Sequence, residues 1–382
     1  MRIVYVLDTI RGLGGIERVI VTKANALAEI DGNEVYIVTI VEKKELPQVF
    51  ELSPKVHLID IDLINYQWNP AHSNLVNCLL SWAQKSKYRS QLLQQLNKIS
   101  PDIVITCGKR DKYLYPSKRK RQWKLIREFH EGKDAEVRIS PTWFLRLVSR
   151  TTTFIDLHLN VPKCDKVVLL TREEQERYWK HKKNVIVIPN PLAIKCDQPS
   201  TLDQKCLISV GRLDQFKNFA ALIRAFATVC RKHQDWKLKI YGDGVEKDSL
   251  QNQIDHQGLQ DHVFLMGFTD NVVDALCQAS IFGFSSITEG FGLVLVEAME
   301  CGVPVVSYQC PNGPKDIITD GVNGFLVPVG DEQMLADRIC TIIEDKELHQ
   351  SMGRAAKENA RNYQLDMIMT QWMKLFNELV HA

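Results

Sequence analysis

The chain has 382 residues, of which 45% are hydrophobic and 25% charged, so it can build sizeable cores and is not a disordered protein. A formal net charge of +2 excludes a globally basic nucleic-acid-binding protein. The ten cysteines are scattered without a CxxC pair, which argues against a zinc ribbon or a thioredoxin-type site and fits a reducing compartment. Neither a secretion signal nor an apolar run of about 18 residues is evident, so we expect a soluble, cytoplasmic protein of two domains.

Short β-branched runs alternate with longer helical patterns along the first half of the chain. The expected strands are residues 2–7, 34–40, 56–61, 102–107, 124–129, 166–170 and 185–189. Amphipathic segments separate several of these strands, most clearly at 16–29 and at about 75–98. Strands joined by helical crossovers of about ten or more residues form βαβ units, which indicates a parallel sheet.

The second half repeats this pattern. Its expected strands are residues 206–210, 238–242, 263–267, 281–285, 303–308 and 324–328, and the remaining C-terminal residues are expected to be helical. The proline-rich segment 189–200 has no periodicity and predicts a linker. We therefore expect an α/β fold of two Rossmann-like domains, residues 1–190 and 191–382, with the last helix as a candidate to cross back to the first domain.

The first motif consists of Gly12, Gly14 and Gly15, between an expected strand and an expected helix. Glycines at such a turn let the backbone approach a ligand closely, and the N-terminus of the following helix attracts anions. Glu17 occupies the position of the third glycine, so the complete dinucleotide-binding fingerprint is absent. A plain tight turn and an anion-binding loop both remain open at this point.

The second motif, Gly211-Arg212 followed by Lys217, comes directly after the strand 206–210. Open α/β sheets bind ligands at the carboxyl ends of their strands. Arg212 as a bidentate fork and Lys217 as a point charge suit a phosphate group. The alternative is a pair of solvated loop cations.

The third motif begins with Glu289, continues with Gly290-Phe291-Gly292 and opens a helix that carries Glu297. The glycines expose backbone N–H groups at the start of the helix, and carboxylates are good acceptors for sugar hydroxyl groups. Because Glu297 lies in a mostly apolar helix, we expect it to be at least partly buried and to have a partner. The alternative is an amphipathic helix with surface glutamates.

The two glutamates, with seven residues between them and GFG after the first, resemble the signature of the family 4 retaining nucleotide-sugar glycosyltransferases. The glycine pair Gly14-Gly15, the GR…K pattern of 211–217 and a GDG at 242–244 match as well. The resemblance implies the GT-B architecture, with two facing Rossmann-like domains, a deep cleft between them, no required metal ion, and no cofactor apart from the nucleotide-sugar substrate.

The resemblance also implies roles for the donor-binding residues. Arg212 and Lys217 would hold the donor diphosphate and stabilise the charge that develops as it leaves, which is typically the largest catalytic contribution. Glu297 would bind the ribose hydroxyl groups. Gly14 and Gly15 would close over the diphosphate.

Further residues would hold the transferred sugar. Glu289 and the loop of Gly290, with the backbone amides of Phe291 and Gly292, would bind its hydroxyl groups. His130, which follows the expected strand 124–129, resembles the histidine that lies near the reacting sugar carbon in this family. The alternative for His130 is a surface histidine at a strand end.

The segment 310–327 is similar to the CPxGPxEI stretch of family members that build bacterial surface polysaccharides and lipid-linked glycans, with Asp316 in place of the glutamate. The alternative is a proline-glycine loop without a ligand. The pair Asp60 and Asp62 forms a DxD sequence, the metal-nucleotide motif of another glycosyltransferase architecture. We interpret it as structural because it ends a strand in the first domain, and chance matches are frequent.

Residues 109–150 contain 13 Lys and Arg against 5 acidic residues, and residues 141–156 mix aromatic and aliphatic side chains with arginine. Basic charge beside apolar surface is typical of proteins that bind anionic membranes. A solvated face is the alternative. A peripheral site on the cytoplasmic face of the membrane would suit a polyprenyl-diphosphate-linked acceptor.

The hypothesis is thus a retaining hexosyltransferase that moves a sugar from a UDP-sugar to a lipid-linked glycan in lipopolysaccharide or capsule synthesis. Two alternatives remain open. A nucleotide-sugar 2-epimerase would have a similar architecture and need no acceptor. An NAD-dependent oxidoreductase would fit paired Rossmann patterns, although the missing third glycine argues against it.

Overall fold

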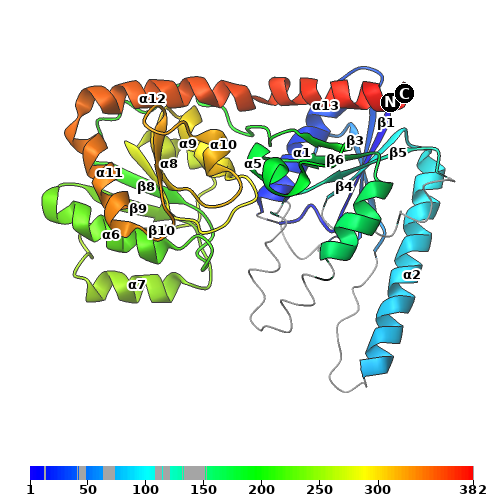
Figure 1. The fold of residues 1–382 in the computed structure, drawn as a ribbon, viewed down its shortest axis with the longest axis horizontal. Coiled ribbons are helices and arrows are strands. Elements are labelled where there is room, and N and C mark those ends of the chain that lie inside the picture. The colour runs from blue at the N-terminus through cyan, green and yellow to red at the C-terminus, as the bar shows by residue number, and fades with distance from the viewer. Residues whose placement is uncertain are drawn as a thin grey trace. The chain divides into compact units, whose positions relative to one another are not determined.

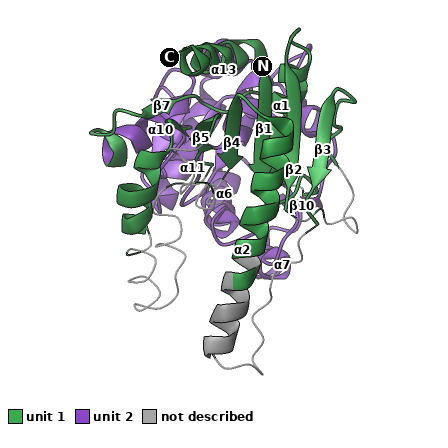
Figure 2. Ribbon diagram, turned by 90° about the vertical axis from the view of Figure 1, so that its right-hand side faces the viewer, with its two compact units in different colours: residues 1–169, 178–193, 365–382 green, residues 170–177, 194–364 purple. Residues whose placement is uncertain are grey.

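The computed structural model describes residues 1–382 except 13, 41, 43–48, 63–73, 108–113, 115–120, 131, 133–150, 152 and 382. The chain divides into two compact units (Figure 2). Unit 1 comprises Met1–Leu169, Tyr178–Ala193 and Leu365–Ala382, and unit 2 comprises Leu170–Arg177 and Ile194–Gln364. Each unit is a layered α/β structure around one parallel sheet.

Unit 1 contains a seven-stranded parallel sheet in the order β3-β2-β1-β4-β5-β6-β7. Its strands are β1 (Arg2–Leu7), β2 (Glu34–Thr39), β3 (Val56–Asp60), β4 (Ile103–Cys107), β5 (Lys124–Glu128), β6 (Lys166–Leu169) and β7 (Val185–Val187). Its helices are α1 (Gly15–Ala28), α2 (Asn74–Ile99), the short η3 (Asp156–Asn160), η4 (Val161–Lys163) and the C-terminal α13 (Leu365–Val380). The seven strands expected from the sequence are confirmed.

The sheet of unit 1 is covered on both faces, because alternate residues of each strand point to opposite sides. Ile3, Tyr5 and Leu7 of β1 belong to a core with α1 and α13. Val4 and Val6 belong to a second core with the C-terminal part of α2. The near-continuous apolar run RIVYVL is therefore typical of a strand buried on both faces.

Helix α13 contributes a full apolar stripe to unit 1. Ile368, Met369, Trp372, Leu375, Phe376 and Leu379 are all buried in the same core as β1. The spacing of three and four residues between these positions matches one face of an α-helix. The last helix of the chain is thus part of the first unit, as Figure 2 shows.

Unit 2 contains a six-stranded parallel sheet in the order β10-β9-β8-β11-β12-β13. Figure 1 labels β8, β9 and β10 of this sheet. Its strands are β8 (Cys206–Val210), β9 (Lys237–Tyr241), β10 (Val263–Gly267), β11 (Ile281–Phe284), β12 (Val305–Tyr308) and β13 (Gly324–Val327). Its helical segments are α5 (Arg172–Glu174), η5 (Gln175–Trp179, shared with unit 1), α6 (Phe219–Lys232), α7 (Lys247–His256), α8 (Val272–Cys277), α9 (Leu293–Glu300), α10 (Pro314–Ile317), α11 (Glu332–Glu344), α12 (Lys346–Ala360) and η6 (Arg361–Tyr363). The order in which the strands run outward from a central first strand is that of a Rossmann-like sheet.

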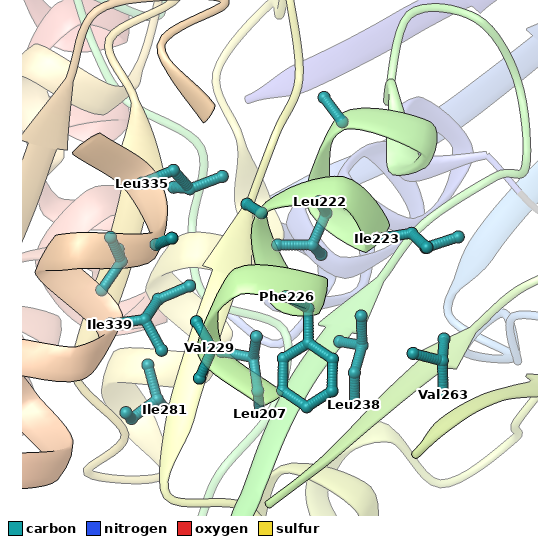
Figure 3. Packing of buried hydrophobic residues seen from close by; sticks show 14 of the residues in the cluster. Leu207, Leu222, Ile223, Phe226, Val229, Leu238, Val263, Ile281, Leu335 and Ile339 are labelled. Atoms are coloured by element: carbon teal, nitrogen blue, oxygen red, sulfur yellow. The ribbon is translucent and has the colours of Figure 1, made fainter. Parts of the chain in front are cut away.

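Helix α6 forms the centre of the main core of unit 2. Figure 3 shows Leu222, Phe226 and Val229 of this helix packed against Leu207 and Leu238 of the sheet. The same core extends to α11, which packs beside α6, whereas α12 packs beside α9. Each unit therefore buries its own apolar core.

The unit boundary differs from the sequence prediction mainly at one segment. Residues 1–190 were expected to form the first domain, but residues 170–177 group with unit 2, and residues 191–193 group with unit 1. The 170–177 segment contacts unit 2: the backbone N–H groups of Arg172 and Glu173 donate to the carboxylate of Asp316, at 2.7 and 3.1 Å, and α5 packs beside α10. A contact between residues that are more than a hundred positions apart has no signature in the local sequence.

Candidate functional site

The loop between β8 and α6 carries the GR…K motif and is shaped by Asp214. The carboxylate of Asp214 accepts hydrogen bonds from the backbone N–H groups of Phe216 and Lys217, at 2.9 and 3.1 Å. Its second oxygen lies 2.6 Å from Nε of Arg212. Asp214 thereby holds the loop in place together with the guanidinium of Arg212 and the backbone of Lys217. An aspartate in such a short loop is typical of an Asx turn, and this signal could have identified Asp214 from the sequence.

Lys217 and Glu289 form an ion pair, with Nζ and Oε1 2.6 Å apart. Both side chains are shielded from solvent, with 23% and 11% of their surface exposed. Two further hydrogen bonds join the same loops: Ser285 Oγ donates to the carbonyl oxygen of Lys217 (2.9 Å), and the N–H of Ile287 donates to that of Phe216 (2.9 Å). The sequence-predicted cation and the first predicted glutamate thus meet where β8 and β11 end.

Arg212 has a different environment from Lys217. Its side chain is 75% exposed, and its ion pair is with Asp214 rather than with Glu289. A guanidinium held at one edge and open to solvent at the other retains N–H donors for an anionic ligand.

The Gly290-Phe291-Gly292 loop leads into α9. Gly292 is the N-cap of this helix at a φ of 88°, a left-handed conformation that favours glycine. Phe291 is 3% exposed and packs edge-to-face against Tyr363, with ring centroids 5.7 Å apart. Its side chain is therefore part of the core, and only its backbone can serve a ligand.

Glu297 lies on α9 and is 3% exposed, so the expected burial of this carboxylate is confirmed. It takes part in polar interactions of the folded unit. Burial of this carboxylate, on the helix that follows β11, distinguishes Glu297 from a surface glutamate of an amphipathic helix. Its role toward a ligand stays a prediction.

The backbone of Gly313 packs directly against the backbone of Phe291. Its φ is 127°, and a Cβ atom at this position would lie 1.8 Å from the carbonyl oxygen of Phe291. Because real Cβ atoms do not approach oxygen so closely, any other residue here displaces one of the two backbones. The glycine of the CPNGP sequence is therefore required by a close backbone contact.

We expect Gly313→Ala to lower the free energy of unfolding of unit 2 by at least about 3 kcal/mol, because strain and overlap add. Gly321→Ala is the matched control, since Gly321 also has a positive φ (76°) but a Cβ there meets nothing within 4 Å. The control should cost about 1 kcal/mol from backbone strain alone. Denaturant unfolding of both variants measures the difference, and equal losses would contradict the contact argument.

Two neighbours of the Lys217–Glu289 pair were not predicted from the sequence. Cys310 is fully buried. Burial raises the pKa of its thiol, and the negative charge of Glu289 raises it further to a smaller extent. Glu173 accepts a hydrogen bond from the backbone N–H of Asn312 at 3.0 Å and so holds the same loop. Neither residue has a local motif that would have identified it.

Asp316 has a structural role in unit 2. Both of its carboxylate oxygens accept backbone N–H groups of the 171–174 turn, and burial raises the pKa of the carboxyl group. Asp316 thus holds the 171–174 turn within unit 2, and a ligand role of the 310–327 segment stays a prediction.

In unit 1, Gly14 is the N-cap of α1, and Gly14 and Gly15 are exposed. The side chain of Glu17 folds back over this turn: a Cβ on Gly14 would lie 2.3 Å from Oε2 of Glu17, and one on Gly12 would lie 3.2 Å from its Cδ. The glycines thus allow a close approach, and in this structure the approaching group is the carboxylate of Glu17.

His130 follows β5, and its side chain is 4% exposed, so the alternative of a surface histidine is wrong. Its Nε2 lies 3.5 Å from Oε1 of Glu128, which also forms an ion pair with the fully buried Lys23. Burial alone would raise the pKa of Glu128, but the charges of Lys23 and His130 outweigh burial and lower it to about 2. The sequence did not indicate Lys23, because its partner is 105 residues away.

The remaining predictions concern unit 1 as well. Asp60 accepts hydrogen bonds from the N–H groups of Glu42 (3.2 Å) and Asp62 (3.0 Å), which supports a structural interpretation of the DxD sequence. Most of the basic segment 109–150 lies outside the described residues, so its membrane role stays a prediction. Among the helices that the structure describes, none is long and apolar enough to cross a bilayer.

Comparison with known proteins identifies similar sequences and folds. Residues 193–359 match the family model "Glycosyl transferases group 1". The chain is 36% identical over 180 residues to an N-acetylgalactosamine-N,N'-diacetylbacillosaminyl-diphospho-undecaprenol 4-alpha-N-acetylgalactosaminyltransferase of Campylobacter jejuni, a match that covers 47% of this chain and 48% of that protein. It is 25% identical over 389 residues, and 100% of both chains, to a GalNAc-alpha-(1->4)-GalNAc-alpha-(1->3)-diNAcBac-PP-undecaprenol alpha-1,4-N-acetyl-D-galactosaminyltransferase of the same species.

The fold comparison agrees with the sequence matches. The structure of TarM from S. aureus in complex with UDP and other ligands has a TM-score of 0.77 and 17% identity, and the match covers 98% of this chain and 99% of that chain. The chain spans less than two thirds of the length of several curated relatives that it matches. The two Rossmann-like units are thus those of the GT-B fold, and the sequence matches support a glycosyltransferase of that fold.

Proposed function

We propose that this chain is a retaining, metal-independent hexosyltransferase that moves a sugar from a nucleoside diphosphate donor, with UDP as the nucleotide, to a glycan. The observation that carries the proposal is the shielded Lys217–Glu289 pair at the carboxyl ends of β8 and β11. It brings a cation suited to a diphosphate within 2.6 Å of a carboxylate suited to sugar hydroxyl groups. No cofactor beyond the donor substrate is included in the proposal.

The roles within unit 2 follow from the chemistry of each group. Lys217 and the exposed guanidinium of Arg212 would stabilise negative charge on the departing diphosphate. Glu289 would accept hydrogen bonds from the transferred sugar, together with backbone N–H groups of Phe291 and Gly292. The buried Glu297 would bind the ribose hydroxyl groups.

The roles within unit 1 are proposals from the family resemblance. His130 would contact the reacting sugar, and Glu128 at 3.5 Å would orient its imidazole. Gly14 and Gly15 would approach the diphosphate through their backbone, which requires the side chain of Glu17 to move away from the turn. None of these side chains is proposed as a covalent nucleophile. Retention would rest on the departing phosphate acting as base on the same face of the sugar.

The proposed donor and acceptor rest on the names of similar proteins. Both Campylobacter relatives are named for glycans on diphospho-undecaprenol, and the TarM structure contains UDP. We therefore propose a lipid-linked glycan as acceptor, used in synthesis of a cell-surface polysaccharide such as lipopolysaccharide or capsule. A peripheral position on the cytoplasmic face of the membrane would follow from such an acceptor.

The proposal is tested by incubating the full chain with a panel of UDP- and GDP-sugars and polyprenyl-diphosphate-linked oligosaccharides. We expect mass spectrometry to detect a product one hexose heavier with a UDP-sugar, also when a chelator is present, and NMR to show the anomeric configuration of the donor retained. Conversion of a donor without acceptor into an epimer would instead establish a 2-epimerase. Inversion at the anomeric carbon would contradict the retaining mechanism.

A further inference from the structure

Three cysteine thiols from distant parts of the sequence meet in unit 2. Cys196 lies in the linker segment, Cys277 is the last residue of α8, and Cys301 is the C-cap of α9. The Sγ atoms of Cys196 and Cys277 are 3.3 Å apart, and all three Sγ atoms lie within 4.8 Å of one another. Cysteines scattered in the sequence are thus gathered by the fold.

The spacing of these sulfur atoms fits a metal ion bound by three thiolates. A tetrahedral ion such as Zn²⁺ binds sulfur at about 2.3 Å, which places ligand sulfurs about 3.8 Å apart. The observed spacing, 3.3 Å for one pair and at most 4.8 Å for the others, brackets this value. Rotations of the Cα–Cβ bonds that move sulfur by about 1 Å are sufficient to reach it.

The backbone around the thiols is held in place by independent contacts. The N–H of Cys196 donates to Oε1 of Glu300 (3.2 Å), and its carbonyl oxygen accepts a hydrogen bond from Nζ of Lys357 (2.8 Å). The carbonyl oxygen of Cys301 accepts the N–H of Ser200 at 2.9 Å. A preorganised ligand set loses little entropy when an ion binds.

The carbonyl oxygen of Gln198 accepts hydrogen bonds from the thiols of Cys196 and Cys277. The Sγ atoms of Cys196 and Cys277 both lie 3.3 Å from it. Cys277 is only partly buried, whereas Cys196 and Cys301 are buried, so an ion can enter on the side of Cys277. The fourth position of a tetrahedral ion is left for water or this carbonyl oxygen.

We propose that Cys196, Cys277 and Cys301 form a binding site for one thiophilic metal ion of the Zn²⁺ class. The ion would join the linker segment to the ends of α8 and α9. Because Cys196 lies near Ile194, where the long segment of unit 2 begins, binding would fix the first residues of this segment and would raise the stability of unit 2. The site is distinct from the proposed chemistry, which involves no metal ion.

Metal binding is coupled to the loss of protons from the thiols. Burial raises the pKa of Cys277 to about 11, and the neighbouring Cys196 adds to this rise, whereas the hydrogen bond with Cys301 lowers the pKa. Burial, with the nearby Cys277 and Cys196, raises the pKa of Cys301 further still. The form of cysteine that ligates a metal ion is the thiolate, so each thiol must lose its proton to bind the ion.

The experiment is a titration of the reduced, metal-free full chain with Cd²⁺ and with Zn²⁺. We expect one Cd²⁺ per chain at high affinity, with an ultraviolet sulfur-to-cadmium charge-transfer band of the intensity of three thiolates. Calorimetry in buffers of different ionisation enthalpy should show that Zn²⁺ binding releases protons, since the ligating form of cysteine is the thiolate.

Two variants and two controls test the assignment of the ligands. Cys277→Ser and Cys301→Ser should each weaken Zn²⁺ binding by more than about 100-fold, because loss of an outer-shell partner alone costs about 10- to 100-fold. Cys206→Ser and Cys340→Ser, at buried cysteines outside the cluster, should bind as the parent does. Circular dichroism without metal checks that each variant is folded.

Three results would overturn the proposal. The first is a charge-transfer band that is unchanged in folded Cys277→Ser. The second is its loss in Cys340→Ser, which would assign the ion to the His233, Cys340 and Glu344 group. The third is a combination of two findings: the chain purified without reductant is two mass units lighter because of a Cys196–Cys277 disulfide, and the same chain does not bind Zn²⁺ after reduction.

Discussion

Lys217→Ala is expected to lower kcat/KM for sugar transfer by about 10³-fold, equivalent to about 4 kcal/mol of transition-state stabilisation. The variant removes the cation proposed to face the leaving diphosphate, and it leaves the shielded carboxylate of Glu289 without its 2.6 Å partner. Steady-state kinetics with the donor found in the panel measures the effect. Lys232→Ala is the control, because Lys232 is an exposed lysine of the same unit at the far end of α6.

The same prediction extends to the partner residues. Glu289→Ala should be similarly impaired, and the double variant should lose less than the sum of the two losses, because residues in contact are not independent. Arg212→Ala should lose activity without loss of stability, since its side chain is 75% exposed. Full turnover in a folded Arg212→Ala or Glu289→Ala variant would contradict the site assignment.

Lys23→Met is expected to lower the free energy of unfolding of unit 1 by about 3–5 kcal/mol, the usual cost of leaving one member of a buried ion pair unpaired. Lys23 and Glu128 are 0% and 1% exposed, and the ammonium group of Lys23 also lies 4.5 Å from the ring centroid of Trp372. Hydrogen exchange of the α1 and α13 peptides, with denaturant unfolding, measures the loss in the unit concerned.

Lys55→Met is the matched control, because Lys55 and Glu29 form an ion pair whose side chains are 58% and 59% exposed. It should change stability by less than about 0.5 kcal/mol. The double variant Lys23→Met/Glu128→Gln should recover part of the loss, since no unpaired charge then remains buried. Equal effects of Lys23→Met and Lys55→Met would contradict the importance of burial.

The ion pair also predicts an acid dependence. The pKa of Glu128 is about 2 in the folded unit, below its usual 4.5, so the pair contributes its full stability above pH 4.5. This contribution is lost as the pH falls from 4.5 toward 2, because over this range Glu128 takes up a proton in the unfolded chain but stays ionised in the folded unit. Lys23→Met should therefore show a weaker loss of stability over this pH range than the parent.

The strands and the two-unit architecture could be predicted because they depend on local periodicity. The run RIVYVL is apolar at every position after the first, and β1 is buried on both faces. The apolar positions of α6 and α13 recur every three or four residues, and both helices bury that stripe. Such patterns need no knowledge of distant residues, since each element must bury its own apolar face.

The site could be predicted in part for the same reason. The GR…K and Glu-Gly-Phe-Gly sequences follow strands, and the carboxyl ends of parallel strands lie on one edge of the sheet, which places both motifs at the same edge. Lys217 and Glu289, 72 residues apart, are in contact at that edge. The pairing of Arg212 with Asp214 was not foreseen, although both are in one loop.

The sequence by itself determined which segments become strands and helices, where the glycines permit close approach, and which residue types stand at the ends of the strands. Only the tertiary structure decided several polar contacts: Lys23 with Glu128, Asp316 with the 171–174 turn, and three scattered cysteines with one another. These contacts join residues that are dozens to more than a hundred positions apart. They arise when whole elements pack their apolar faces, and that packing leaves no local signal in the residues it brings together.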